Sequence, residues 1–117
     1  MPQASVKRLI EVEREFTLFN AKIISKILEK YNKEDDVIGF HGQTIFHNPN
    51  KKITKQLGDG KLLSQITKKI VINNFREKDL KNGGQGAPLT PIFHKLISQD
   101  LVKKNKLSFP LNIINIG

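Results

Sequence analysis

Short apolar segments alternate with amphipathic helical patterns along this chain, and that alternation limits the possible folds more than any other feature. The segments expected to form strands are residues 37–40, 53–57, 70–72 and 111–116. The patterns expected to form helices are residues 11–31, 61–67 and 91–101. Because strands that alternate with helices usually pair in parallel, the sequence predicts an α/β fold.

The first helical pattern carries an apolar stripe with spacings of three and four residues. The stripe is formed by Phe16, Phe19, Ile23, Ile27 and Tyr31. We interpret this stripe as the face that packs on the core.

Shorter signals complete the prediction of local structure. Asp59 is expected to cap the helix over residues 61–67. The Asn-Pro-Asn sequence at residues 48–50 predicts a turn, and residues 73–81 are expected to form a polar loop or a short helix. Ligands of parallel sheets bind beyond the carboxyl ends of strands, so residues 41–44 and 74–79 are expected near a site.

Length and composition limit the function classes. The 117 residues are expected to form a single domain, and the absence of cysteine excludes disulfides and thiolate metal sites. The net charge of +9 comes from 20 Lys and Arg against 11 Asp and Glu, but the cations are scattered and only Arg8, Arg14 and Arg76 are arginines. We therefore expect no nucleic-acid partner. No apolar run reaches the roughly 18–20 residues that span a bilayer, so no membrane partner is expected.

Two polar segments could carry chemistry. His41, Gln43 and Thr44 bring an imidazole, an amide and a hydroxyl together, and such groups can hydrogen-bond a sugar. The alternative is a strand-end turn in which His41 is satisfied internally. Arg76 follows the strand over residues 70–72 and could bind an anion, or it could pair with Glu77 or Asp79.

The segment Gly83-Gly84-Gln85-Gly86-Ala87-Pro88 forms a third candidate. Its glycines could present successive N–H groups to a phosphate, although it matches neither the Walker A nor the GxGxxG pattern. The alternative is a tight turn that another backbone or a ligand approaches closely. The histidines are not spaced as metal ligands, and no metal site is expected.

Read in order, four motifs resemble the anhydro-N-acetylmuramic acid kinase family. They are His41-Gly42-Gln43-Thr44, Gln56-Leu57-Gly58-Asp59-Gly60, Phe75-Arg76-Glu77-Lys78-Asp79, and Gly83 to Leu89 followed by Pro91 and Phe93-His94. The resemblance covers residues 15–117. It implies part of an actin/Hsp70/sugar-kinase-like lobe, also called ribonuclease H-like, with a mixed sheet and helices.

The same resemblance implies an activity. Members of the family use ATP and Mg²⁺ to open a 1,6-anhydro ring and phosphorylate O6 of the amino sugar, in cytoplasmic cell-wall recycling. The residues implied on the sugar side are His41, Gln43, Thr44, Arg76, Gly84, Gln85 and Gly86. The residues implied on the cofactor side are Asn115 and Gly117.

The chain also departs from the family pattern. The family's Gly-Thr-Ser-x-Asp-Gly phosphate loop and its Asp base have no counterpart in residues 1–117, and Asn73-Asn74 stands where the family usually has Gly-Asp. We therefore expect a truncated, single partial domain without the second lobe, inactive alone and binding neither ATP nor Mg²⁺ by itself. Its expected partners are an amino sugar and kinase segments supplied as separate chains. The alternative is a non-catalytic remnant that binds a sugar or a protein.

Overall fold

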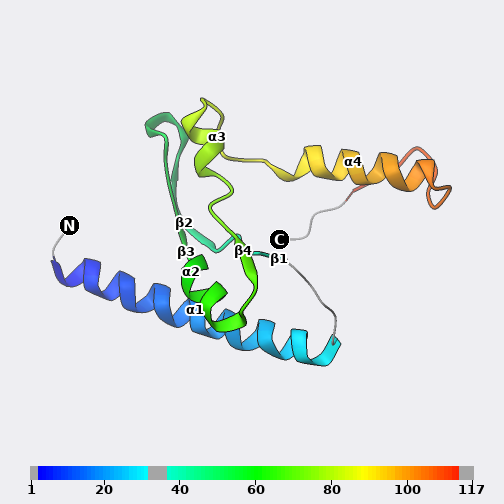
Figure 1. Cartoon of the computed structure of the whole chain (residues 1–117). Helices are drawn as coiled ribbons and strands as arrows, with labels where there is room; N and C mark the ends of the chain where they lie inside the picture. Colours follow the sequence, from blue (N-terminus) through cyan, green and yellow to red (C-terminus); the bar gives the residue numbers. More distant parts are fainter. Residues whose placement is uncertain (1–2, 32–36, 114–117) are drawn as a thin grey trace.

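The computed structural model describes residues 3–31 and 37–113. The described residues form the α-helices and β-strands that Figure 1 labels. They are α1 (Gln3–Tyr31), β1 (Val37–Gly39), β2 (Gln43–Asn48), β3 (Ile53–Leu57), α2 (Gly60–Thr67), β4 (Ile70–Ile72), α3 (Glu77–Lys81) and α4 (Thr90–Lys103). A single 3₁₀ turn, Pro49–Lys51, joins β2 to β3.

The strands confirm the α/β class and the parallel pairing, but they form two small sheets in place of one mixed sheet. β1 and β4 run parallel, with Val37 opposite Ile70. β2 and β3 form an antiparallel hairpin. Gly42 turns the chain between β1 and β2 with a φ of +67°, so β2 leaves the parallel sheet and pairs with β3 instead.

The core lies where α1 crosses α2 and the inner face of the parallel sheet. Ala21, Phe40 and Leu63 are buried there, and Leu63 has no exposed surface. The Phe40 ring stacks on Phe16 with centroids 6.2 Å apart. Ile38, the central residue of β1, also packs on this cluster.

The buried face of α1 differs from the predicted stripe. Phe16 of the predicted stripe packs on the core as expected, but the buried residues are Thr17 and Ala21, and Phe19, Ile23 and Ile27 remain exposed. Small side chains at the crossing let α1 approach α2 closely. The buried face of α1 is therefore formed by Thr17 and Ala21 and not by the larger residues beside them.

Three further elements differ from the prediction. α1 begins at Gln3, before the predicted start at residue 11, and β2 is not among the predicted strands. The strand predicted over residues 111–116 is wrong for residues 111–113, which form no strand, while residues 114–116 lie outside the described part. The predictions of α2, α3 and α4 are confirmed to within a few residues.

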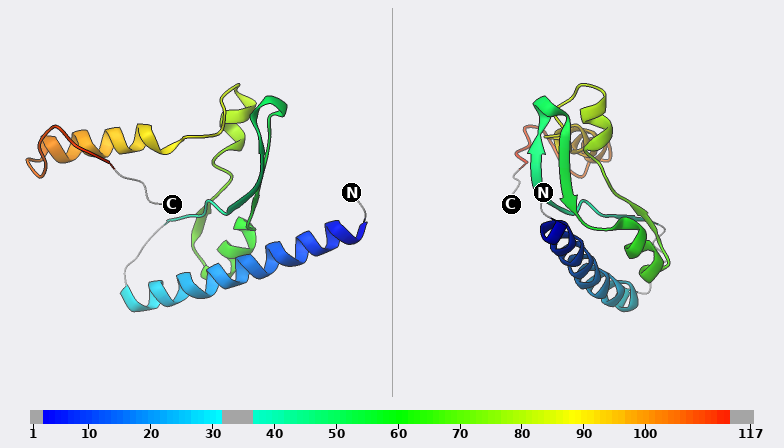
Figure 2. Two further views of the ribbon diagram at one scale, coloured as in Figure 1. Left: turned by 180° about the vertical axis from the view of Figure 1, so that it is seen from behind. Right: turned by 90° about the vertical axis from the view of Figure 1, so that its left-hand side faces the viewer.

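α4 projects away from the other elements, and the segment after it doubles back alongside it (Figure 2). None of its residues is buried. Ile92, Phe93 and Leu96 expose more than half of their surface. α4 is therefore a formed helix whose apolar side chains contribute nothing to the core.

Candidate functional site

The carboxyl ends of the two parallel strands place polar residues at one edge of the sheet. His41 follows β1 after Phe40, and Asn73 and Asn74 follow β4 directly. The backbone N–H of Phe40 donates to the carbonyl of Ile72 over 2.8 Å, so the two strands remain paired up to this edge. The β1–β4 pairing therefore brings residues 41 and 74, both expected beyond the carboxyl ends of strands, to one edge of the sheet together with Asn73.

His41 is exposed and makes one hydrogen bond within the described chain. Its Nδ1 lies 2.5 Å from the carbonyl oxygen of Gly42. Since a carbonyl oxygen only accepts, Nδ1 is the donor in this contact, and Nε2 makes no hydrogen bond within the described residues. The internal turn contact and a ligand contact are therefore compatible, because they use different nitrogens.

A row of hydrogen-bonded side chains crosses one face of the hairpin. Gln56 Nε2 donates to Thr44 Oγ1 over 3.3 Å and to Thr54 Oγ1 over 2.7 Å. Thr54 Oγ1 in turn lies 3.2 Å from Nδ1 of His47. We call these four residues the hairpin row. Thr44 was expected at a site, whereas Gln56, Thr54 and His47 were not; the run of polar residues at 54–56 within a predicted strand was the available signal.

Arg76 contacts the glycine loop and not a carboxylate. Its Nη1 donates to the carbonyl of Gly86 over 3.1 Å. Glu77 instead pairs with Lys81 at 3.5 Å, and Asp79 accepts a bond from the Gly86 N–H. The alternative in which Arg76 pairs with Glu77 or Asp79 is therefore wrong.

The residues implied on the sugar side fall into two groups. Arg76, Gly84 and Gly86 are brought together around the start of α3, with Gln85 exposed between the two glycines. His41 and the exposed Gln43 lie at the other end of the hairpin, where Gln43 Nε2 donates to Thr44 O over 3.4 Å. Within residues 3–31 and 37–113, no hydrogen bond joins the groups directly.

The hairpin row nevertheless links the two groups. Thr44 begins it next to Gln43, and His47 ends it beside the glycine loop. A Cβ added to Gly86 would lie 3.2 Å from His47 Cε1, so the loop seats directly on that ring. Asn115 and Gly117, implied on the cofactor side, lie outside the described residues.

A polar cavity of about 390 Å³ lies beside this row. It is bounded by α1, β3, the start of α2 and the connection from β4 to α3. Its lining residues are Glu13, Thr54, Lys55, Gln56, Gly58, Asp59, Gly60, Lys61, Asn73, Asn74 and Glu77. The volume and the mixture of amides, hydroxyls and charges suit a small polar molecule.

The carboxylates at the cavity already have partners that hold the fold. Glu13 Oε1 accepts from Lys55 Nζ over 2.7 Å and from Gly58 N over 3.3 Å. Asp59 caps α2 by accepting from Leu62 N over 2.9 Å, which confirms the predicted cap. Glu13 and Asp59 therefore each use one carboxylate oxygen to hold neighbouring elements together.

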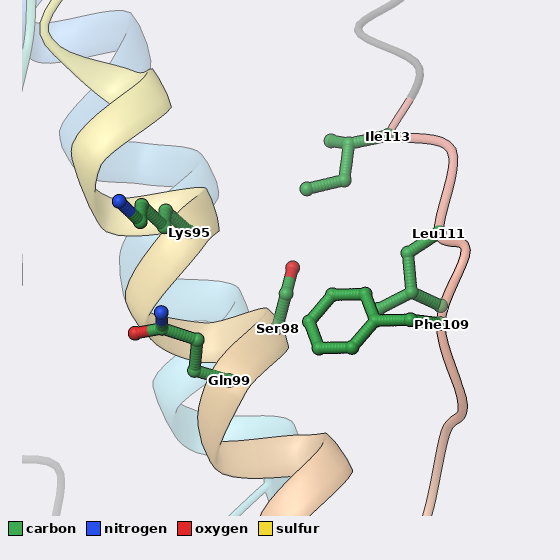
Figure 3. Close-up of a pocket in the computed structure, with 6 residues that line it drawn as sticks. All are labelled: Lys95, Ser98, Gln99, Phe109, Leu111 and Ile113. Carbon is green, nitrogen blue, oxygen red and sulfur yellow. The ribbon is translucent and has the colours of Figure 1, made fainter.

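A second cavity of about 240 Å³ lies between α4 and the segment that follows it (Figure 3). Phe109, Leu111 and Ile113 face the helix there. Ser98 already donates its hydroxyl to His94 O over 2.7 Å. This lining offers a sugar few hydrogen bonds, so the polar cavity is the stronger candidate.

Two negative findings apply to the described part of the chain. No group of three or more His, Cys, Asp and Glu side chains there is arranged to hold a metal ion. No helix there is both long and apolar enough to cross a bilayer.

Comparison with known proteins yields one consistent family. The model of the anhydro-N-acetylmuramic acid kinase family matches residues 1–117. A kinase of that description from Pelagibacter ubique is 55% identical over 107 residues, which cover 92% of this chain and 28% of the relative. One from Rhodopseudomonas palustris is 40% identical over 92% of this chain and 29% of its own length. One from Brucella abortus is 40% identical over 93% and 30%. The chain thus spans less than a third of the curated relatives it matches.

Proposed function

Because the chain belongs to the anhydro-N-acetylmuramic acid kinase family, we propose that it supplies the sugar-binding side of such a kinase. The proposed reaction of the whole enzyme is ATP-dependent opening of a 1,6-anhydro ring with phosphorylation at O6, in cytoplasmic recycling of cell-wall sugars. The proposed setting is a ribonuclease H-like lobe, for which the parallel β1–β4 pair and the adjoining hairpin are suitable parts.

One observation carries the proposal: Arg76 is oriented by the protein but not neutralised by it. Its single hydrogen bond to Gly86 O uses one of five N–H donors. Among the described residues, no carboxylate lies within ion-pair distance of its guanidinium. A sugar acid offers a carboxylate, which a guanidinium can bind through two parallel hydrogen bonds.

The remaining contacts suit the uncharged parts of an amino sugar. Gln56, Asn73 and Asn74 bring side-chain amides to the lining of the polar cavity, and the donors of Gln56 bond to Thr44 and Thr54, which leaves its amide oxygen for a ligand. Hydroxyl and acetamido groups of a sugar both donate and accept, so they need such a mixed set. Arg76 does not line this cavity but precedes Glu77, which does, so we propose that the sugar occupies the cavity with its carboxylate directed toward Arg76.

Phosphoryl transfer is assigned to other parts of the kinase. ATP and Mg²⁺ serve that transfer in the family, and the family's phosphate loop and Asp base have no counterpart in residues 1–117. A chain of these 117 residues alone is therefore expected to bind the sugar without phosphorylating it.

Calorimetric titration with 1,6-anhydro-N-acetylmuramic acid tests the proposal. Arg76→Ala is expected to weaken binding at least about tenfold, because it removes a charge-assisted bond. Arg8→Ala, on the exposed start of α1, is the matched control and is expected to leave the affinity unchanged. Equal affinities of the two variants would contradict the role of Arg76.

Mass spectrometry tests separately whether this chain transfers a phosphoryl group by itself. The chain is incubated with the sugar, ATP and Mg²⁺, and the mass of the sugar is then measured to detect an added phosphoryl group. Unchanged sugar is the expected result. A phosphorylated product from these 117 residues would overturn the assignment of phosphoryl transfer to other segments.

A further inference from the structure

Both peptide groups of Gly86 are held by side chains of one short segment. The Gly86 N–H donates to Asp79 Oδ2 over 2.7 Å. The Gly86 carbonyl accepts from Arg76 Nη1 over 3.1 Å. Arg76 precedes α3 and Asp79 lies within it. Two side chains about one helical turn apart therefore bind the loop from two sides.

Asp79 also contacts the start of the loop. Its backbone carbonyl accepts from the N–H of Gly84 over 2.9 Å. A Cβ added to Gly84 would lie 2.2 Å from Asp79 Oδ2, so the loop passes directly over the carboxylate. Glycine at residue 84 leaves this carboxylate in place, and Gly86, with a φ of +67°, adopts the left-handed conformation that favours glycine.

Arg76 and Asp79 carry opposite charges but do not pair with each other. Arg76 and Asp79 are three residues apart, a spacing at which opposite charges on a helix commonly pair. Here the carboxylate accepts the loop N–H and the guanidinium donates to the loop carbonyl, so both are directed to Gly86. The loop thus separates the two charges that would otherwise neutralise each other.

We propose that Asp79 is a positioning residue for the sugar site. By fixing Gly86, Asp79 fixes the carbonyl that orients Arg76 and leaves the guanidinium charge for an anionic group of the ligand. The identity of that ligand rests on the function proposed above, whereas the hold of Asp79 on the loop does not.

Substitutions at residue 79 separate the hydrogen bond from the charge. Asp79→Asn keeps an oxygen that can accept from Gly86 N, whereas Asp79→Ala removes the acceptor. Asp100→Ala is the matched control, because Asp100 lies on α4 and pairs only with Lys104 among the described residues.

Amide hydrogen exchange of the ligand-free chain tests the hold on the loop. The Gly86 amide is expected to exchange at least about tenfold faster in Asp79→Ala, and at nearly the wild-type rate in Asp79→Asn and Asp100→Ala. Unchanged protection of Gly86 in Asp79→Ala would overturn the proposal. If Asp79→Ala does not fold by circular dichroism, Gly84→Ala, which displaces the same carboxylate, is measured in its place.

Titration with 1,6-anhydro-N-acetylmuramic acid then tests the effect on binding. The dissociation constant is expected to rise about tenfold in Asp79→Ala and to be restored to within about threefold by Asp79→Asn. Wild-type affinity in Asp79→Ala despite fast Gly86 exchange would overturn the positioning role. If the wild-type chain binds no sugar, the proposed function fails and the exchange rates alone decide whether Asp79 holds the loop.

Discussion

Apolar spacing predicts both α2 and α4 as helices, yet only α2 packs on the core. α2 is eight residues long and buries Gly60 and Leu63. α4 is 14 residues long and buries none. α2 is capped by the side chain of Asp59, whereas Leu89, at the corresponding position of α4, offers no side-chain cap.

This difference shows that apolar spacing predicts a helix but not the element on which that helix packs. Leu63 is covered because α1 places the small residue Ala21 and the ring of Phe16 nearby. Leu96 has the same side chain but no such neighbours, and it is 59% exposed. Leu63 is therefore buried because α1 covers α2, and no described element covers Leu96 in the same way.

The largest expected effect compares leucine truncations in the two helices. Leu63→Ala leaves a cavity in the core and is expected to lower the free energy of unfolding by about 2–5 kcal/mol. Leu96→Ala, on exposed α4, is expected to change it by no more than about 0.5 kcal/mol. Urea denaturation measures both, and similar losses would show that α4 is as well packed as α2.

A smaller effect is expected where α1 holds the start of α2. Buried Thr17 accepts from Asp59 N over 2.9 Å and donates to Glu13 O over 2.7 Å. Thr17→Val leaves the Asp59 N–H without this acceptor and is expected to cost about 1–3 kcal/mol. Ser98→Ala is the control, because its hydroxyl bonds only within α4. A Thr17→Val midpoint in urea equal to that of Ser98→Ala would show that this bond does not hold α2.

The smallest effect concerns the cap itself. Asp59→Ala removes the bond to Leu62 N and is expected to cost about 1 kcal/mol. Asp100→Ala breaks only an exposed pair with Lys104 and is expected to cost about 0.5 kcal/mol or less. Thermal unfolding would contradict the ranking if Asp100→Ala lowered the melting temperature more than Asp59→Ala did.

Most helices and the parallel strands could be predicted from the sequence because their signals are local. The Asp59 cap and the β-branched residues of β4 are examples. β2 could not be recognised from residues 43–48 alone, because its side chains are half exposed and its pairing depends on β3. The start of α1 was missed because Val6 and Ile10 are exposed and lie outside the predicted stripe.

The site was predictable as a set of motifs but not as an arrangement. Arg76 and Gly86 stood out in the sequence, yet nothing local indicated that a guanidinium would donate to a loop carbonyl. Thr54 and His47 meet only because the hairpin pairs them across the strands. Contacts of this kind depend on register, which a single sequence specifies weakly.

The central claim is that one end of this molecule binds an amino sugar while α4 takes no part. A two-dimensional NMR titration with 1,6-anhydro-N-acetylmuramic acid tests this most directly, with α4 as the internal reference. We predict shifts of the Arg76 side-chain N–H, the Gly84 and Gly86 amides and the Gln56 side-chain amide, with the signals of α4 unchanged. Shifts confined to α4, or none around Arg76 and Gly86 at saturating sugar, would contradict the account.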